Sequence, residues 1–223
     1  MEDLKKLANQ ISSSELRRVV LDALDDPNNV LIERFGDELD FESSPASKKV
    51  HQSYPGGLVE HTLALTEMAL ALASVIEKIY HAELNRDILI AGGILHDFYK
   101  FLTYKKEDNR YERSRIGSKI DHLTLTVAEF YRRDISIDLL HVLVAHHGKE
   151  GAAAPRSLEA LIIHLADVCD SEFMNETLLG AQEIINKLGI KVKEWNAKKA
   201  LEICKIMAEK GNIGVKEYLK IKK

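Results

Sequence analysis

Apolar residues along this chain recur at spacings of three and four, and the apolar–polar alternation typical of strands is nearly absent. Such spacing is typical of α-helices that bury one face against a core. It predicts helices over residues 11–24, 30–35, 58–80, 85–97, 120–131, 137–147, 157–179 and from about 192 onward. The pattern therefore predicts an all-α fold.

Two segments between these helices lack a helical pattern. Residues 41–51 contain Ser43-Ser44-Pro45 and are expected to form a loop or short turn. Residues 103–119 are charged and are expected to form a long irregular loop, at the surface or as a lid. Its basic residues are Lys105, Lys106, Arg110, Arg113, Arg115 and Lys119.

A chain of 223 residues is long enough for one substantial hydrophobic core. We expect residues 1–50 to form helices that pack on a central helical domain of residues 51–180. Residues 181–223 would form a C-terminal helical extension, and the three parts together one globular unit. The oligomeric state is left open between a monomer and a homodimer.

The composition limits which partners the protein is expected to bind and in which cellular compartment it is expected to occur. The net charge is −4, so a nucleic acid would need a local basic patch for binding. Cys169 and Cys204 lack metal-site spacing and are expected to be reduced thiols. The first residues resemble no signal peptide, and no run approaches the roughly 20 uninterrupted apolar residues of a membrane span. We therefore expect a cytoplasmic protein without a membrane partner.

The pair His96-Asp97 directly follows the small and apolar run at residues 89–95. Burying an imidazole and a carboxylate without partners costs a few kcal/mol, so a packed helix gains nothing from them. A metal ion removes this difficulty, because imidazole nitrogen and carboxylate oxygen are standard ligands.

Further candidate ligands occur in successive helical segments, one or two in each. They are His61, His122, His146, His147 and Asp167. Helical bundles build metal sites from side chains of facing helices that converge on the core. The sequence therefore predicts a helical bundle with a metal site in its core.

The ordered set His61, His96-Asp97, His122, His146 and Asp167 resembles the HD-domain metal-dependent phosphohydrolases, an α-helical family named for its His…His-Asp…Asp ligands. Residues 45–62, 145–148 and 158–167 are similar to the HD module of the YhaM-type 3′-5′ exoribonucleases. That branch usually carries an amino-terminal OB-fold domain, for which we see no counterpart here. Tyr99 and Asp121 also stand where that family or branch usually has glycine.

The resemblance implies hydrolysis of a phosphoester in a nucleotide, a cyclic phosphodiester or the 3′ end of RNA. His61, His96 and Asp167 would hold one ion, and His122 and His146 a second, with His147 as a substitute or supporting group. Asp97 can bridge the ions because its carboxylate has two oxygens. Nitrogen and oxygen ligands without thiolate suit Mn, Fe, Co, Ni or Zn, and one or two ions are expected.

Several further residues are candidates for catalysis or substrate contact. Asp97 and Lys100 are the predicted catalytic residues, because Lys100 follows His96 by four positions and would share its face if the helix continues. His51, Lys100, His147 and Lys149 are the predicted substrate contacts. His164 precedes Asp167 by three residues and could orient it.

Two other functions are alternatives. Some HD-fold oxygenases use these six ligands for two irons that activate dioxygen. A non-catalytic signalling or interaction domain would be expected to lack some of the ligands, and all six are present. The sequence after His146-His147 is Gly148-Lys149, which differs from the pattern of cyclic-dinucleotide phosphodiesterases. Phe98-Tyr99 after His96-Asp97 likewise differs from the alarmone hydrolases.

Overall fold

The computed structural model describes residues 1–26, 39–108 and 110–221, and the regular secondary structure of this part of the chain is helical apart from one short hairpin. The all-α prediction is confirmed. The α-helices are α1 (Glu2–Ala8), α2 (Ser14–Asp25), α4 (Gly57–Tyr80), α5 (Arg86–Leu95), α6 (His122–Arg132), α7 (Ile137–Ala145), α8 (Leu158–Lys187) and α9 (Ala197–Ile221). Two 3-10 helices, η1 (Phe98–Thr103) and η2 (Gly148–Glu150), and the strands β1 (Tyr104–Glu107) and β2 (Arg110–Arg113) complete the set.

Most helices begin where the polar residues of the sequence indicate. Ser13, Asn85, Ser136 and Ser157 each accept a hydrogen bond from a backbone N–H of the first turn of α2, α5, α7 and α8. The helix α1 was not predicted from the pattern, because it is only seven residues long. The helix predicted over residues 30–35 lies outside the described residues.

The prediction of an irregular loop over residues 103–119 is wrong for the two strands β1 and β2, while residues 115–119 form turns. The strands β1 and β2 pair antiparallel, with Tyr104 opposite Arg113 and Glu107 opposite Arg110. At the base of the hairpin the Ser114 N–H donates to Thr103 O, and a Cβ on Gly117 would lie only 2.1 Å from that oxygen. Each strand has four residues, too few for an alternating pattern to stand out among so many charges.

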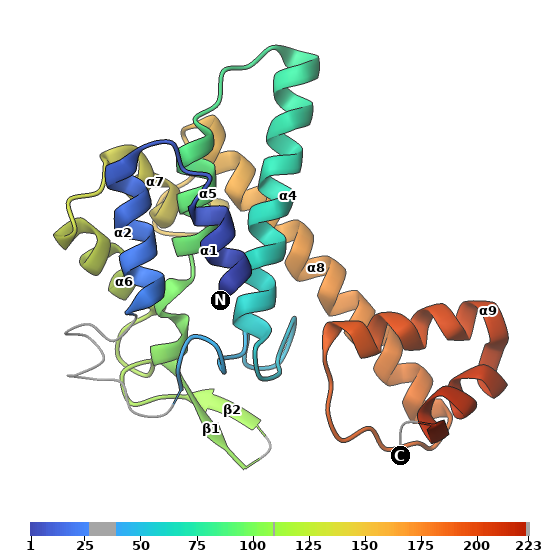
Figure 1. Cartoon of the computed structure of the whole chain (residues 1–223). Coiled ribbons are helices and arrows are strands. Elements are labelled where there is room, and N and C mark those ends of the chain that lie inside the picture. Colours follow the sequence, from blue (N-terminus) through green and yellow to red (C-terminus); the bar gives the residue numbers. More distant parts are fainter. Residues whose placement is uncertain (27–38, 109, 222–223) are drawn as a thin grey trace.

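The helix α5 occupies the centre of the bundle in Figure 1, and every residue from Ile88 to Leu95 is buried. Its two glycines allow this close packing. A Cβ on Gly93 would lie 2.5 Å from Thr66 Oγ1 of α4, and one on Gly92 would lie 2.6 Å from Val142 Cγ1 of α7. Since α5 ends at Leu95, His96 and Asp97 follow directly after it and lie buried in the interior between these helices.

The buried apolar residues form two separate clusters. The larger one joins α1 and α2 to α4, α5, α6, α7 and the first half of α8, while the smaller one joins the second half of α8 to α9. Figure 1 shows α8 running out of the bundle toward α9. The boundaries at residues 50 and 180 stay a prediction, but α8 is continuous across the second of them.

The helix α4 is long and apolar enough to cross a membrane by length and composition alone. A third of that window is buried, and core helices of soluble proteins meet the same criterion. In this fold α4 packs against α5 and α8 and contributes His61 to the interior.

Candidate metal centre

The structure brings the predicted ligands together in two adjoining groups, within each of which the candidate ligand atoms lie within 4.8 Å of one another. The Asp97 cluster consists of Asp97, His122, His146 and His147. The His61 cluster consists of His61, His96 and Asp167. Six segments supply these residues: the first turns of α4, the ends of α5 and α7, the start of α6, the turn after α7, and the middle of α8. Their role as ligands stays a prediction, but their convergence is a property of the fold.

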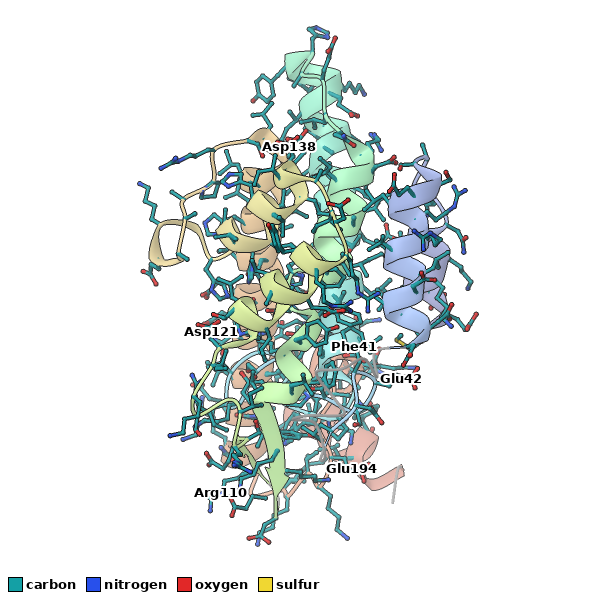
Figure 2. The ribbon with its side chains drawn as sticks, turned by 90° about the vertical axis from the view of Figure 1, so that its left-hand side faces the viewer. Phe41, Glu42, Arg110, Asp121, Asp138 and Glu194 are labelled. Atoms are coloured by element: carbon teal, nitrogen blue, oxygen red, sulfur yellow. The ribbon has the colours of Figure 1, made fainter. Side chains whose placement is uncertain are left out.

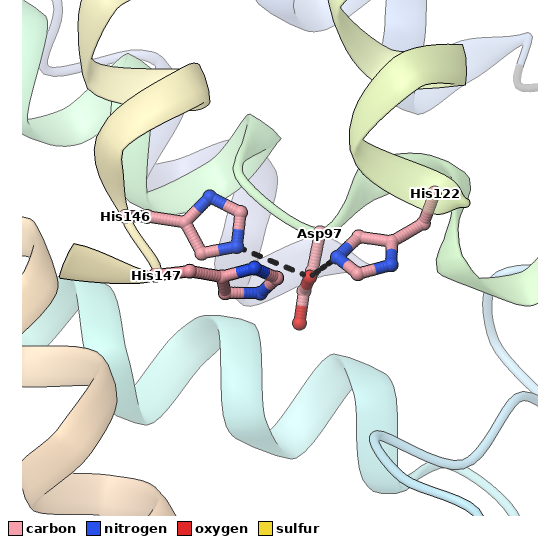
Figure 3. Close-up of side chains that lie close together, drawn as sticks. All are labelled: Asp97, His122, His146 and His147. Atoms are coloured by element: carbon pink, nitrogen blue, oxygen red, sulfur yellow. Dashed lines mark ion pairs between the residues drawn. The ribbon is translucent and has the colours of Figure 1, made fainter. Parts of the chain in front are cut away.

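The carboxylate of Asp97 belongs to the Asp97 cluster and also faces the His61 cluster. Its Oδ1 is 3.0 Å from His122 Nε2 and 3.7 Å from His146 Nε2. Its Oδ2 is 3.4 Å from His96 Nε2 and 3.7 Å from His61 Nε2. Figure 3 shows Asp97 between His122 on one side and the pair His146 and His147 on the other. Each oxygen of one carboxylate therefore faces a different set of imidazoles, as a bridging ligand requires.

Three of the histidines use Nδ1 to contact oxygen, which directs Nε2 toward the ligand set. His96 Nδ1 is 2.8 Å from Gly93 O, and His146 Nδ1 is 2.8 Å from Leu143 O. His61 Nδ1 is 2.7 Å from Asp170 Oδ2. Carbonyl and carboxylate oxygens only accept hydrogen bonds, so each Nδ1 donates. In the neutral ring Nε2 is then the free lone pair that can bind a metal.

Buried polar atoms of the Asp97 cluster have no hydrogen-bond partner within the described residues. They are Asp97 Oδ1, His122 Nε2 and His146 Nε2. Burial, reinforced by the neighbouring His96, holds the pKa of His146 well below its usual range, so this ring is neutral. Imidazole nitrogens and a carboxylate oxygen that lack other partners fit a bound cation, which would satisfy all of them.

The His61 cluster is satisfied differently, by carboxylates on both sides of one ring. His61 Nε2 lies 3.2 Å from Asp167 Oδ1, while Nδ1 contacts Asp170. Burial lowers the pKa of His61, but the hydrogen bonds with Asp167 and Asp170 outweigh it and raise the pKa to about 9. Burial raises the pKa of Asp167, but His61 and His96 outweigh it and lower that pKa below its usual value.

Asp170 is a residue that the sequence reasoning missed. It follows Asp167 by three positions on α8, so both side chains face the same way, and it is buried. Its Oδ2 also accepts a hydrogen bond of 2.7 Å from Gln52 Nε2. A second aspartate one turn after a predicted ligand is the signal that could have identified it.

Lys100 contacts the bridging carboxylate directly. The sequence placed Lys100 on the same helix face as His96 only if the helix continued that far. It does not continue, because α5 ends at Leu95 and Lys100 lies in the 3-10 helix η1. Its Nζ is nevertheless 2.5 Å from Asp97 Oδ2. Burial raises the pKa of Asp97, but Lys100, His96 and His122 outweigh it and hold that pKa well below its usual range.

The other predicted contact residues differ in position. The His51 ring lies 5.0 Å from that of His61, and burial lowers the pKa of His51 to about 4. The His147 ring lies 5.3 Å from that of His122. Lys149 is exposed and lies outside the linings of both cavities at the site. His164 was expected to orient Asp167, but its Nδ1 instead contacts His146 O at 2.8 Å.

Two cavities open beside the clusters. The first has a volume of about 360 Å³ and is lined by His122 and His147 together with residues of the hairpin and η2. The second has a volume of about 320 Å³ and is lined by His146, His147 and Asp167, among others. His147 and Glu150 line both. A substrate could therefore reach both clusters from these adjoining cavities.

Comparison with known proteins identifies relatives over most of the chain. A family model described as HD domain matches residues 58–172. The dihydroneopterin 2′,3′-cyclic phosphate phosphodiesterase of Methanocaldococcus jannaschii is 38% identical over 222 residues, which cover 99% of this chain and 89% of that protein. The 3′-5′ exoribonuclease YhaM of Listeria innocua is 31% identical over 160 residues, which cover 63% of this chain and 46% of that protein. No solved structure matches.

Proposed function

Because this chain belongs to the HD domain family, we propose that it is a metal-dependent phosphodiesterase that opens a 2′,3′-cyclic phosphate on a small pterin-like molecule. The main observation in support of this proposal is the position of Asp97, whose Oδ1 faces His122 and whose Oδ2 faces His96. The match to the phosphodiesterase supports the cyclic substrate, because it takes in nearly all of both chains. The match to the exoribonuclease takes in less than half of that protein.

The residues present fit one or two divalent transition-metal ions. Asp97, His122 and His146 would hold one ion, and His61, His96, Asp167 and the second oxygen of Asp97 the other. The buried atoms without partners in the Asp97 cluster support this assignment. A donor set of imidazole and carboxylate favours Mn, Fe, Co, Ni or Zn. Bound there, such ions acidify a water molecule and neutralise charge on a phosphoryl oxygen.

The reaction adds water across one ester bond of the cyclic phosphate. The water oxygen bonds to phosphorus, one ring P–O bond breaks, and the leaving oxygen takes up a proton to give a phosphomonoester. Lys100 keeps Asp97 ionised, and its ammonium lies near enough to the ligand set to contact a phosphate oxygen. We assign His147, which lines both cavities, to a further contact with the substrate, and His51, whose ring lies 5.0 Å from that of His61, to a second. Lys149 lies outside both linings, so its predicted substrate contact is not part of this proposal. His51 and His147 have lowered pKa values and act as neutral imidazoles.

The test is hydrolysis of dihydroneopterin 2′,3′-cyclic phosphate by the purified protein, with and without each metal, together with metal analysis by mass spectrometry. We expect a phosphomonoester product and metal near two per chain. Absence of metal, or no cleavage of any phosphoester with metal bound, would reject the proposal. Dioxygen consumption without phosphoester cleavage would instead favour the di-iron oxygenase.

We also propose that the enzyme acts in the cytoplasm. Cys169 and Cys204 are free thiols in the structure, and such thiols persist in a reducing compartment. Fractionation of the producing cells with detection of the protein by antibody tests this location.

A further inference from the structure

The first cavity combines a polar rim with flat and apolar walls beside the Asp97 cluster. Tyr104 and Arg113 reach it from opposite strands of the hairpin, and Asp121 reaches it from the start of α6. Figure 2 shows Asp121 above the hairpin that carries Arg110. Its volume of about 360 Å³ is at the small end of the range for ligand pockets. A single bicyclic ring, rather than an extended polymer, matches that space.

Asp121 presents a carboxylate whose orientation is fixed by the fold. It is the N-cap of α6, and its Oδ1 accepts a hydrogen bond of 2.7 Å from the Thr124 N–H. A carboxylate offers about four acceptor positions, so the cap leaves capacity for a ligand. Glu150 also lines the cavity and both side chains are exposed, but within the described residues no hydrogen bond fixes the carboxylate of Glu150 in the short helix η2. Of the two carboxylates, Asp121 is therefore the one whose orientation is fixed before a ligand binds.

Arg113 supplies the complementary donor. Its Nη1 donates to Gly117 O at 2.8 Å, which fixes the guanidinium, and its remaining N–H groups are available to a ligand. The cavity thus offers a carboxylate acceptor and a guanidinium donor within one lining. A ring that displays a carbonyl oxygen beside two adjoining N–H donors has the matching edge.

We propose that this cavity binds the heterocycle of the substrate and that Asp121 selects rings with an adjoining pair of N–H donors, as pterin and guanine have. This inference rests on the proposed phosphodiesterase function and names the specificity residue of the same site. The two N–H groups of such a ring can donate in parallel to a carboxylate, a geometry that favours selectivity as well as affinity. Adenine lacks the donor pair and is the natural comparison.

The experiment measures kcat/KM for guanosine 2′,3′-cyclic phosphate and adenosine 2′,3′-cyclic phosphate with the metal-loaded enzyme and its Asp121→Asn variant. Asparagine caps a helix as well as aspartate does, so α6 is retained. We expect the native enzyme to prefer the guanosine compound by at least about tenfold. Asp121→Asn should lower kcat/KM for that compound by about ten- to a hundredfold, mainly through KM, and leave the adenosine compound within about twofold.

Two controls distinguish a role of Asp121 in selecting the heterocycle from a role in positioning the neighbouring His122. Metal content and hydrolysis of bis-p-nitrophenyl phosphate, which lacks the heterocycle, should be unchanged in Asp121→Asn. Glu150→Gln should leave the guanosine preference intact.

Three results would overturn the inference: equal rates for the two nucleotides in the native enzyme, an equal loss for both in Asp121→Asn, or loss of the preference in Glu150→Gln instead. Failure of the native enzyme on every phosphodiester would reject the proposed function itself.

Discussion

The Asp97 cluster and the His61 cluster share one carboxylate, yet their buried atoms are satisfied in opposite ways. In the Asp97 cluster the nitrogens of His122 and His146 lack hydrogen-bond partners within the described residues. In the His61 cluster one imidazole lies between two aspartates, which raise its pKa to about 9. The first cluster is therefore prepared for a cation, while the second holds a proton that a cation must displace.

This contrast indicates that metal binding by the two clusters would differ in pH dependence. Access does not distinguish them, because the Asp97 cluster lines the first cavity through His122 and His147 and the His61 cluster lines the second through Asp167. A metal that competes with a proton binds more tightly as the pH rises. The contrast can be tested by removing residues that serve both clusters, one cluster, or neither.

The largest effect is expected from Asp97→Ala, because this carboxylate faces both clusters. We expect loss of both metal ions and a fall in kcat for bis-p-nitrophenyl phosphate of about a thousandfold or more. Mass spectrometry of metal content and steady-state kinetics measure the two effects. Asp138→Asn, at an exposed position in α7, is the matched control and should change neither. Retention of two ions without Asp97 would show that the clusters do not share it.

His122→Ala and Asp167→Asn should each affect one cluster. We expect each variant to retain about one metal ion per chain and to lose activity by about a hundredfold, because in the proposed two-ion reaction each ion stabilises charge on the phosphoryl group. Metal titration followed by calorimetry would show one remaining binding step in each variant. If either variant loses both steps, the two clusters form one cooperative site and the comparison fails.

Asp170→Asn should have a smaller effect, confined to the His61 cluster. The substitution weakens the charged partner of His61 Nδ1 but keeps the side-chain volume. Loss of such a supporting hydrogen bond lowers metal affinity by about ten- to a hundredfold. Competition with a fluorescent chelator should show weaker binding of one ion and unchanged binding of the other. Equal weakening of both would assign Asp170 a general structural role.

The last prediction concerns the metal-free protein, and its effect is on stability rather than on metal affinity or activity. The folded-state pKa of His61 is about 9, above the value of 6.5 expected when unfolded, so the folded state binds the extra proton. The resulting stabilisation is fully present below about pH 6.5 and is lost as the pH rises through about 9. Urea unfolding in the presence of a chelator should show the free energy of unfolding falling by roughly 3 kcal/mol at most across this window.

The same titration with saturating metal provides the control for this prediction. The ion then replaces the proton on His61, so the decline should be absent or reversed. A metal-free protein whose stability is constant from pH 6.5 to 9 would contradict the contrast between the clusters.

The sequence predicted the helices and the converging side chains well, for a physical reason. Long amphipathic helices repeat their apolar positions many times, and His96-Asp97 stands out because nothing else in the buried run of α5 is polar. The hairpin and α1 were missed because each is too short to establish a period. The continuation of α5 to Lys100 was wrong, and the contact of Lys100 with Asp97 arises from a 3-10 turn that a four-residue spacing does not describe.

The hydrogen-bond partners of the candidate ligands were harder to predict than the convergence of the candidate ligands themselves. Gln52 and Asp170 are 118 positions apart, and only the packing of the loop before α4 against α8 brings them into contact. His164 contacts the His146 backbone because Gly148 lets the chain turn against its ring, where a Cβ would lie 2.4 Å from the ring carbon Cε1. Contacts of this kind depend on tertiary structure, so spacing along one helix misassigned His164 to Asp167.

The ends of three helices give the metal centre an electric field of its own. His96 and His146 cap the C-terminal ends of α5 and α7, and each of these two helix ends carries a partial negative charge equivalent to about half an electron. The helix α6 begins at His122 with the opposite sign, but the Asp121 carboxylate caps this end and balances part of its positive charge. The backbone therefore favours a cation where α5 and α7 end, and this preference exists before any ion binds.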